Sequence, residues 1–305
     1  MKLHHFHEIV AIAERGSIRA AARHLGIAQS ALTRSLAELE REFGGALFER
    51  RARGVAPTQL GQSFVRNGTL VLNQIRRTRD EIDQIRNHAT GAVTVGLSIA
   101  AHLALLPASL RPFAARYPDV RLNVIEGFYP TLEAGLRDGS VDFYIGPHQD
   151  GKILPELSRE PLFGGRRIVL CRAGHPLARA RSLHDIAGAD WISTSITATA
   201  EDEIVEIFLA LGLPAPRVAV RCQSALSLIT CLLNTDLLAM VPMQWNEFAL
   251  TRGTLTTIDI AQTLAAPPIV LIKRIDLPLP PATTYLLDLL RRAQAHIHAR
   301  PGRSA

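Results

Sequence analysis

Three closely spaced arginines are the first residues in the chain whose types and spacing could do chemistry. Arg50, Arg51 and Arg53 lie just before Gly54 and Pro57, two residue types that favour a tight turn between short strands. The planar guanidinium group stays charged and donates several hydrogen bonds to phosphate oxygens. The pattern therefore predicts a short basic hairpin, or wing, whose tip can contact phosphates.

The distribution of charge supports this placement. Residues 1–90 hold 14 Lys and Arg against 9 Asp and Glu, whereas the rest of the chain is nearly neutral within a total of +6. A basic head on a neutral body favours a polyanion-binding module joined to a second unit. On charge alone, a chance placement of a few charges is the alternative.

The hydroxyl of Ser98 is the second group that could do chemistry. Residues 96–100, GLSIA, are similar to the G-x-S-x-G elbow that presents a nucleophilic serine. Such a hydrolase needs strands ahead of the elbow, and His296 and His298 on the C-terminal helix have no evident acidic partner. We therefore favour a binding role for Ser98 and keep a hydrolase as the alternative.

Ser98 fits better as a hydrogen-bond donor to a ligand, because a helix N-terminus favours anions. A second hydroxyl-rich strand end, residues 193–199 (STSITAT), also leads into a predicted helix. Two such helix starts facing each other across a cleft would suit a carboxylate or another small anion. Each hydroxyl could equally serve only as a helix cap.

The elements that must hold these groups follow from hydrophobic spacing, which predicts consecutive helices in the first ninety residues. Arg15 and Gly16 end the first helix, Ser17 caps the second, and Gly26 turns the chain into a third. Two short helices joined by a glycine-containing turn are typical of a helix-turn-helix, whose second helix enters the major groove of DNA.

A longer helix is predicted from Gly61 to His88. Apolar or small residues alternate in steps of four and three, a spacing typical of pairing with a partner helix. This candidate seam consists of Phe64, Gly68, Val71, Ile75, Thr78, Ile82 and Ile85. The alternative is a helix packed on its own domain.

After Thr90 the pattern changes to alternating strands and helices, which implies a parallel sheet covered by helices. Predicted strands cover residues 93–97, 120–126, 141–145, 168–171, 191–193, 217–221, 237–241 and 268–273. Predicted helices cover residues 100–117, 131–138, 200–211, 224–234 and 283–298. Two α/β units of about one hundred residues each would leave a cleft between them, the usual place for a small ligand.

Other classes of protein are disfavoured. Polar residues interrupt the apolar residues at the start of the chain, unlike a secretory signal, and the most apolar later stretch, 225–243, is too broken for a membrane span.

Cys171, Cys222 and Cys231 are too few for a disulfide framework and lack metal-ligand spacing, so we expect no cofactor. A redox pair of Cys222 and Cys231 is the less favoured alternative to buried structural thiols. We expect a cytoplasmic protein.

These residues also carry a family resemblance. The N-terminal motifs are residues 16–25 (GSIRAAARHL), Gln29, Arg34, Leu39-Glu40, residues 47–50 (LFER) and Leu60-Gly61. The later motifs are residues 105–107 (LLP), Phe113, Tyr117-Pro118, 138–142 (DGSVD), 175–178 (HPLA) and 237–242 (LLAMVP). Over essentially its whole length, the chain resembles the LysR-type transcriptional regulators.

The resemblance implies an N-terminal all-α winged helix-turn-helix at residues 1–60 and a long dimerisation helix at 61–90. It also implies an α/β, periplasmic-binding-protein-like effector domain, with lobe I at 91–162 and 268–305 and lobe II at 163–267. The implied function is sequence-specific regulation of transcription and not catalysis. The implied partners are double-stranded DNA, a second or further copy in a homodimer or homotetramer, and a small-molecule effector between the lobes, with no membrane. A small-molecule-binding module with an inert head stays open as a different class.

The site residues implied by the resemblance fall into two groups. The DNA-binding group is Gln29, Ser30, Thr33, Arg34, Arg50, Arg51 and Arg53. The effector-binding group is Ser98, Ile99, Ala100, Phe128, Tyr129, Pro147, His148, Thr194, Ser195, Ile196 and Thr197. Arg can bridge guanine O6 and N7, and Gln can pair with adenine. The alternatives are a merely solvated helix face for Thr33 and Arg34, and a solvent-facing loop position for His148.

One position departs from the family pattern. The family usually has Ser or Thr before the conserved Gln and Pro after it, whereas this chain has Ala28 and Ser30. Alanine supplies no capping oxygen, which costs about 1 kcal/mol. Ser30 could cap the helix instead by accepting from the amide of Thr33, which would move Gln29 off the helix.

Overall fold

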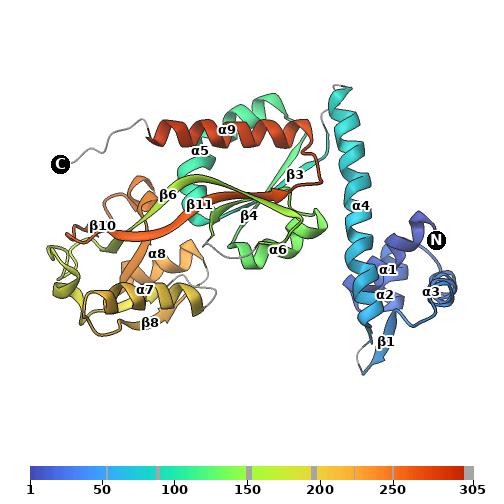
Figure 1. The fold of residues 1–305 in the computed structure, drawn as a ribbon, viewed down its shortest axis with the longest axis horizontal. Helices are drawn as coiled ribbons and strands as arrows, with labels where there is room; N and C mark the ends of the chain where they lie inside the picture. The colour runs from blue at the N-terminus through green and yellow to red at the C-terminus, as the bar shows by residue number, and fades with distance from the viewer. Residues whose placement is uncertain are drawn as a thin grey trace.

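The computed structural model describes residues 1–52, 54–86, 90–148, 153–193, 198–222, 224–248 and 251–298. Figure 1 shows a small N-terminal head, one long helix and a larger α/β body. The long helix stands between the head and the body and joins them.

Three short helices form most of the head: α1 (Leu3–Arg15), α2 (Ile18–Leu25) and α3 (Gln29–Phe43). Gly16 and Gly26 end the first two in left-handed conformations, and Ser17 caps α2 by accepting from the amide of Ala20, as the sequence predicts. The apolar faces meet in one core that includes Ile9, Ile12, Ala21, Leu32, Leu39 and Leu47. The predicted helix-turn-helix is therefore present.

The predicted wing follows as an antiparallel hairpin of β1 (Phe48–Arg51) and β2 (Gly54–Pro57). Thr58 then caps the long helix α4 (Gln59–Ile85), because its hydroxyl oxygen accepts from the amide of Gly61 at 3.1 Å. The helix thus begins two residues before the predicted start.

The first part of α4 packs on the head. Phe64 stacks on Phe6 of α1, and Gly68 lies so close to Phe6 and Val10 that an added Cβ would meet the Phe6 ring at 3.2 Å. The first two positions of the candidate seam therefore pack within their own domain. Further along the seam, Val71, Ile82 and Ile85 are exposed, the last at 68%.

The body begins with three parallel strands, β3 (Ala92–Leu97), β4 (Arg121–Glu126) and β5 (Phe143–Pro147), joined by α5 (Ile99–Arg116) and α6 (Tyr129–Asp138). The predicted βαβαβ unit is confirmed. Figure 1 shows α5 beside the C-terminal helix α9 (Pro281–His298) on one face of the sheet and α6 on the other. We call this half of the body lobe I.

The other half of the body, lobe II, contains β7 (Asp190–Ser193), β8 (Arg217–Arg221), β9 (Leu238–Pro242), β10 (Leu255–Ile258), α7 (Ala198–Ala210) and α8 (Ala225–Asn234). Two short 3₁₀ helices cover Leu183–Ile186 and Met243–Glu247. The strand β10 and both 3₁₀ helices were not predicted. Trp191 and Phe208 meet edge-on in one of the two cores of this lobe.

Two long antiparallel strands run through both lobes, β6 (Leu157–Arg172) and β11 (Leu264–Arg274). The sequence predicts only residues 168–171 and 268–273 of them. The sheet has the order β4-β3-β5-β11-β6-β9-β7-β8, with β10 paired to β6. The β6–β11 register shifts between Ala266 and Ile269, where two prolines lack an amide to donate.

The start of α5 also joins the lobes. Ile99 and Leu103 pack against the second core of lobe II, which contains the buried Trp245. The first turn of α5 therefore lies where the two lobes meet.

Candidate DNA interface and effector site

The third helix of the head presents one polar face. Leu32, Leu36 and Leu39 of α3 are buried in the core of the head. Four of the predicted contact residues are exposed: Gln29, Ser30, Thr33 and Arg34. Residues four apart lie one above the other on a helix, so the structure brings these four side chains together on one strip.

The start of this helix differs from one expectation. Helix α3 begins at Gln29, and the N-cap is Ala28, whose carbonyl oxygen accepts from the amide of Leu32 at 3.2 Å. The hypothesis that Ser30 caps the helix is therefore wrong. Ala28 already has extended backbone, with ψ 136°, so the first helical bonds form without a capping oxygen. The cap position simply lacks a side-chain acceptor.

The hydroxyl of Thr33 is partly committed within the helix. It donates to the carbonyl oxygen of Gln29 at 2.9 Å. Its lone pairs remain for a donor on a base edge, whereas contact with a phosphate, which only accepts, would require the hydroxyl to turn away from Gln29.

On the wing, Arg50 and Arg51 are exposed. Arg51 donates from Nε to Glu49 at 3.0 Å, but both side chains are at the surface, where such a pair contributes little. Arg51 can therefore exchange Glu49 for a phosphate at small cost. The predicted contact Arg53 lies outside the described residues.

Glu40 positions the wing, although the sequence indicated it only as part of a motif. The carboxylate of Glu40, near the end of α3, accepts from the amides of Leu47 at 2.7 Å and Phe48 at 3.4 Å. These bonds attach the first strand of the wing to α3. Only the order of residues in the motif could have signalled this role.

In the body, Ser98 joins β3 to α5. Its hydroxyl oxygen accepts from the amide of Ala101 at 3.3 Å, and its own amide donates to Ile145 of β5 at 2.9 Å. Only 1% of the residue is exposed. A nucleophile elbow presents its serine on an exposed turn, so this geometry fits a helix cap and not a catalytic serine.

The neighbouring effector candidates differ in what they expose. Ile99 is half-buried against lobe II. Ala100 is 2% exposed within the core of lobe I, so only its backbone amide is placed to face a ligand. The first turn of α5 thus offers backbone amides and one apolar side chain.

The candidates from the other two strands of lobe I gather at the carboxyl ends of β4 and β5. Tyr129 meets His148 edge-on, with ring centroids 4.7 Å apart, and the hydroxyl of Tyr144 donates to the carbonyl oxygen of Pro147 at 3.4 Å. Phe128 is the half-buried N-cap of α6. Burial, reinforced by the charge of Glu133, raises the pKa of Tyr129 to about 12, so its phenol stays neutral.

His102 is a further candidate that sequence reasoning missed. It follows Ser98 by one turn of α5 and is half-buried. Burial lowers the pKa of its imidazole, although the carboxylate of Glu126 opposes the shift, so the ring is neutral near pH 7. The spacing of four residues from Ser98 was the signal available in the sequence.

The lobe II candidates Thr194, Ser195, Ile196 and Thr197 lie outside the described residues. Next to them, the carbonyl oxygen of the buried Ser193 accepts from the amide of Cys222 at 2.9 Å. Burial raises the pKa of the Cys222 thiol, and raises that of Cys171 to about 11, which keeps both in the unreactive thiol form. This agrees with structural cysteines.

Among the residues that the structure describes, His, Cys, Asp and Glu side chains form no group of three that could hold a metal ion. No helix in the same ranges has the length and apolar character needed to cross a lipid bilayer.

The winged helix-turn-helix, the long helix and the two-lobed α/β body define a class of protein: transcriptional regulators that bind DNA with one end and a small molecule with the other. Two family models match the chain in that arrangement. The model of bacterial regulatory helix-turn-helix proteins of the lysR family matches residues 3–62, and that of the LysR substrate binding domain matches residues 86–295. The chain belongs to the LysR family of transcriptional regulators, a family of regulators and not of enzymes.

Curated relatives and solved structures agree with this family. The chain is 28% identical over 284 residues to the HTH-type transcriptional regulator GalR of Pseudomonas putida, covering 93% of this chain and 72% of the relative. It is 26% identical to GbpR of Azospirillum brasilense, covering 96% and 86%. CbnR, a LysR family regulator, superimposes with a TM-score of 0.70 at 19% identity, covering 96% of this chain and 99% of CbnR. CbnR complexed with its target DNA gives a TM-score of 0.69 at 20% identity, covering 96% and 100%. These two structures support the fold alone.

Proposed function

We propose that the chain recognises its operator through the exposed strip of α3 and the arginines of the wing. Arg34 and Gln29 read base edges, Ser30 and Thr33 contact bases or phosphates, and Arg50, Arg51 and Arg53 hold the DNA backbone. The single observation that carries this proposal is the placement of Gln29, Ser30, Thr33 and Arg34 on one exposed face of the second helix of a helix-turn-helix. Base contacts then give specificity, and phosphate contacts give salt-sensitive affinity.

The test is DNA binding by the full-length chain to the region upstream of its own gene, measured against unrelated DNA at low and high salt. The proposal predicts tighter binding to the upstream region and affinity that falls steeply with salt. Binding without any salt dependence or without preference would contradict it, and would favour a small-molecule-binding module with an inert head.

We further propose the division of the chain into a DNA-binding head (1–60), a dimerisation helix (61–90), lobe I (91–162 and 268–305) and lobe II (163–267). The register shift beside Pro267 and Pro268 supports the boundary on β11. On β6, Phe163 pairs with Ile269 just past that shift, which supports the matching boundary at residues 162/163. A regulator that binds the chromosome works where the chromosome is, so we propose a cytoplasmic location.

The exposed part of the seam on α4 supports a homodimer or a homotetramer. Val71, Ile82 and Ile85 are apolar side chains at the surface of a helix that leaves the head, and a second copy of α4 would remove them from water. Replacing Ile82 by Asp is expected to shift the assembly towards monomer in sedimentation equilibrium. The control Gln62→Asp changes an exposed residue of the same helix and is expected to leave the mass unchanged.

The effector, we propose, is a small organic anion bound between the lobes by Ser98, Ile99 and Ala100 from the start of α5. Phe128, Tyr129, Pro147 and His148 would complete the site from lobe I, and Thr194, Ser195, Ile196 and Thr197 from lobe II. The amides at the start of α5 and the neutral phenol of Tyr129 supply hydrogen-bond donors of the kind that a carboxylate accepts.

A thermal-shift screen of small carboxylates against sugars and amines tests this effector class. Stabilisation by carboxylates is expected, and it should weaken in Ser98→Ala. Ser17→Ala is the matched control, because Ser17 caps α2 in the same way, by accepting from the amide of Ala20, but belongs to the head. Stabilisation by neutral or cationic compounds only would contradict the proposal.

A further inference from the structure

A polar stripe on α4 attaches this helix to lobe I. The stripe consists of Asn73, Arg77, Asp80 and Gln84, spaced by four, three and four residues. Each lies two residues after a seam position, which is roughly half a turn around the helix. The stripe and the seam therefore occupy opposite faces, and attachment to lobe I leaves Val71, Ile82 and Ile85 of the seam exposed.

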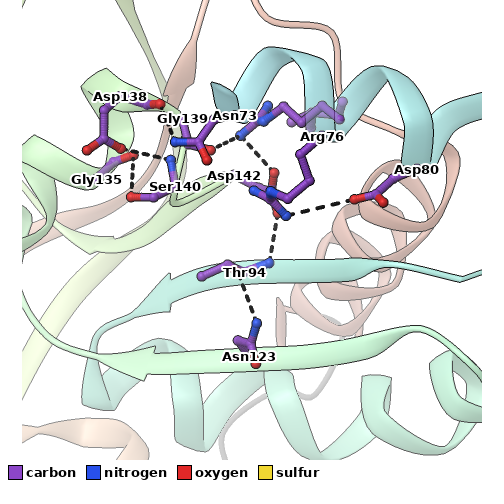
Figure 2. Close-up of polar contacts among 12 residues, drawn as sticks. Asn73, Arg76, Asp80, Thr94, Asn123, Gly135, Asp138, Gly139, Ser140 and Asp142 are labelled. Carbon is purple, nitrogen blue, oxygen red and sulfur yellow. Dashed lines mark hydrogen bonds and ion pairs between the residues drawn. The ribbon is translucent and has the colours of Figure 1, made fainter. Parts of the chain in front are cut away.

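The ends of the stripe hold backbone atoms of lobe I. The side-chain amide of Asn73 donates from Nδ2 to the carbonyl oxygen of Asp138 at 2.7 Å, at the end of α6 (Figure 2). At the other end, Gln84 donates to Thr90 at 3.4 Å and accepts from the amide of Ala282 at 2.9 Å. The helix is thus held at the end of α6, ahead of β3 and at the start of α9.

A buried ion pair lies at the centre of the stripe. The guanidinium of Arg77 is 2.8 Å from the carboxylate of Asp142 and donates to the carbonyl oxygen of Gly139 at 3.0 Å. The two side chains are only 6% and 5% exposed. One guanidinium nitrogen, Nη2, makes both contacts, and Asn73 and Gln84 hold the helix on either side of it, so the rotation of α4 and its distance from lobe I are both fixed.

The same carboxylate is held from the other side by the sheet. Asp142 accepts from the amide of Thr94 in β3 at 2.7 Å (Figure 2), and its own amide donates to the carbonyl oxygen of Thr94 at 2.7 Å. Asp142 directly precedes β5. The ion pair therefore connects α4 to the first residues of β3 and β5.

The pair is not explained by a gain in stability. Burial raises the pKa of Asp142 and lowers that of Arg77, and in each case the attraction of the partner opposes the shift without cancelling it. Taking both charges out of water usually costs about as much as such a contact returns, so a buried ion pair by itself adds little stability. The pair instead fixes one arrangement of α4 relative to lobe I.

We propose that Arg77 and Asp142 are positioning residues that lock the dimerisation helix to lobe I in a single orientation, so that the two move as one body. The consequence for regulation rests on the proposed function. Strands β3 and β5 begin at this joint and end at Ser98 and Pro147, so a displacement caused by an effector at those ends would reach α4 through two short strands.

Amide hydrogen exchange of the full-length chain tests the joint without any effector. In the double variant Arg77→Met/Asp142→Asn, which buries no charge, we expect thermal stability close to the wild type. Exchange should nevertheless rise about tenfold in residues 73–86 and 138–142, while residues 59–70, held by α1, stay unchanged. Arg79→Met is the matched control: it removes one exposed charge from the same helix and should change none of these segments.

Arg77→Lys keeps the test decisive if the double variant does not fold. Lysine retains the charge, but its side chain is one bond shorter than the path to Nη2, the atom that contacts both Gly139 and Asp142, so intermediate protection of residues 73–86 is expected. Wild-type protection of this segment in either folded variant would overturn the proposal.

A footprint on the DNA upstream of the gene supplies a measurement that a merely structural role would not change. The double variant should still bind this DNA, but with a protected region of altered length or graded edges, because the heads are no longer held in one position. A footprint identical to that of the wild type would overturn the positioning role. If the wild type itself gives no footprint, the proposed function fails while the exchange experiment still judges the joint.

Discussion

The amide of Val55 on the wing donates a 2.9 Å hydrogen bond to the carbonyl oxygen of Gly16, where α1 ends. The wing is thereby attached to the turn that leads into the helix-turn-helix. The contact is close because Gly54, with φ 123°, brings its backbone against the same oxygen, and a Cβ there would lie 2.2 Å from it. The position of the wing against the turn between α1 and α2 thus depends on a glycine.

Replacing Gly54 by Ala is therefore expected to destabilise the head by about 1–3 kcal/mol, because a side chain disfavours this backbone conformation and collides with Gly16. Both tryptophans, Trp191 and Trp245, lie in the body, so fluorescence would not report the change. Faster amide hydrogen exchange in residues 3–43 would report the loss of stability of the head. The control Gly164→Ala adds a Cβ that meets nothing within 4 Å. Unchanged exchange in Gly54→Ala would disprove the close approach.

Supplying the missing cap should stabilise the recognition helix. Ala28 already has the backbone of an N-cap, so Ala28→Ser places a hydroxyl oxygen near the amide of Ser30 and near that of Ala31, which now donates to the carbonyl oxygen of Ala28 at 3.0 Å. A gain of about 1 kcal/mol is expected, seen as roughly fivefold slower exchange of the amides in α3. Ala31→Ser, one turn into the helix, offers no cap and is the control. Equal effects of the two substitutions would argue against this account of the helix start.

The destabilisation caused by Arg77→Met should depend on pH. Without Arg77 the buried carboxylate of Asp142 loses the charge that opposes its desolvation, so its pKa, already raised, rises further; Arg76 and Asp80 are the other nearby charges. A group with a raised pKa stabilises the fold below its unfolded value and loses that contribution as pH rises through the folded value.

The loss of stability in Arg77→Met should thus be about 3 kcal/mol or more at pH 7 and should shrink as the pH is lowered through the range above 3.8. Chemical denaturation of the variant and the wild type at matched pH values measures it. A loss of stability that grows as the pH falls would contradict this prediction.

Local pattern was enough to predict most of the elements. The helices of the head and the βαβαβ unit follow from apolar spacing and from caps such as Ser17 and Ser98, which act through neighbours a few residues away. The start of α3 was harder, because the backbone of Ala28 makes the cap without a side-chain signal. The extra length of β6 and β11 depends on pairing between segments about one hundred residues apart, which no local period encodes.

Some residues of the candidate sites could also be placed from local spacing, and others could not. Arg34 and its neighbours could be placed on one face because a helix fixes their spacing. The joint between Arg77 and Asp142 could not be foreseen, since the two residues are distant in sequence and meet only when α4 lies on lobe I. The role of Glu40 depends on the wing strand that begins at Phe48, and the environment of His102 depends on Glu126 at the end of β4, so neither follows from helical spacing alone.

The most direct test of the central claim is the affinity of Arg34→Ala for the DNA upstream of its gene. Arg41→Ala, which removes an exposed charge from the far end of the same helix, is the control. The account predicts that Arg34→Ala loses its preference for this DNA over unrelated DNA, by about 1–3 kcal/mol, and keeps the assembly state of the wild type. Unchanged preference at both low and high salt would contradict the assignment of α3 as the recognition helix.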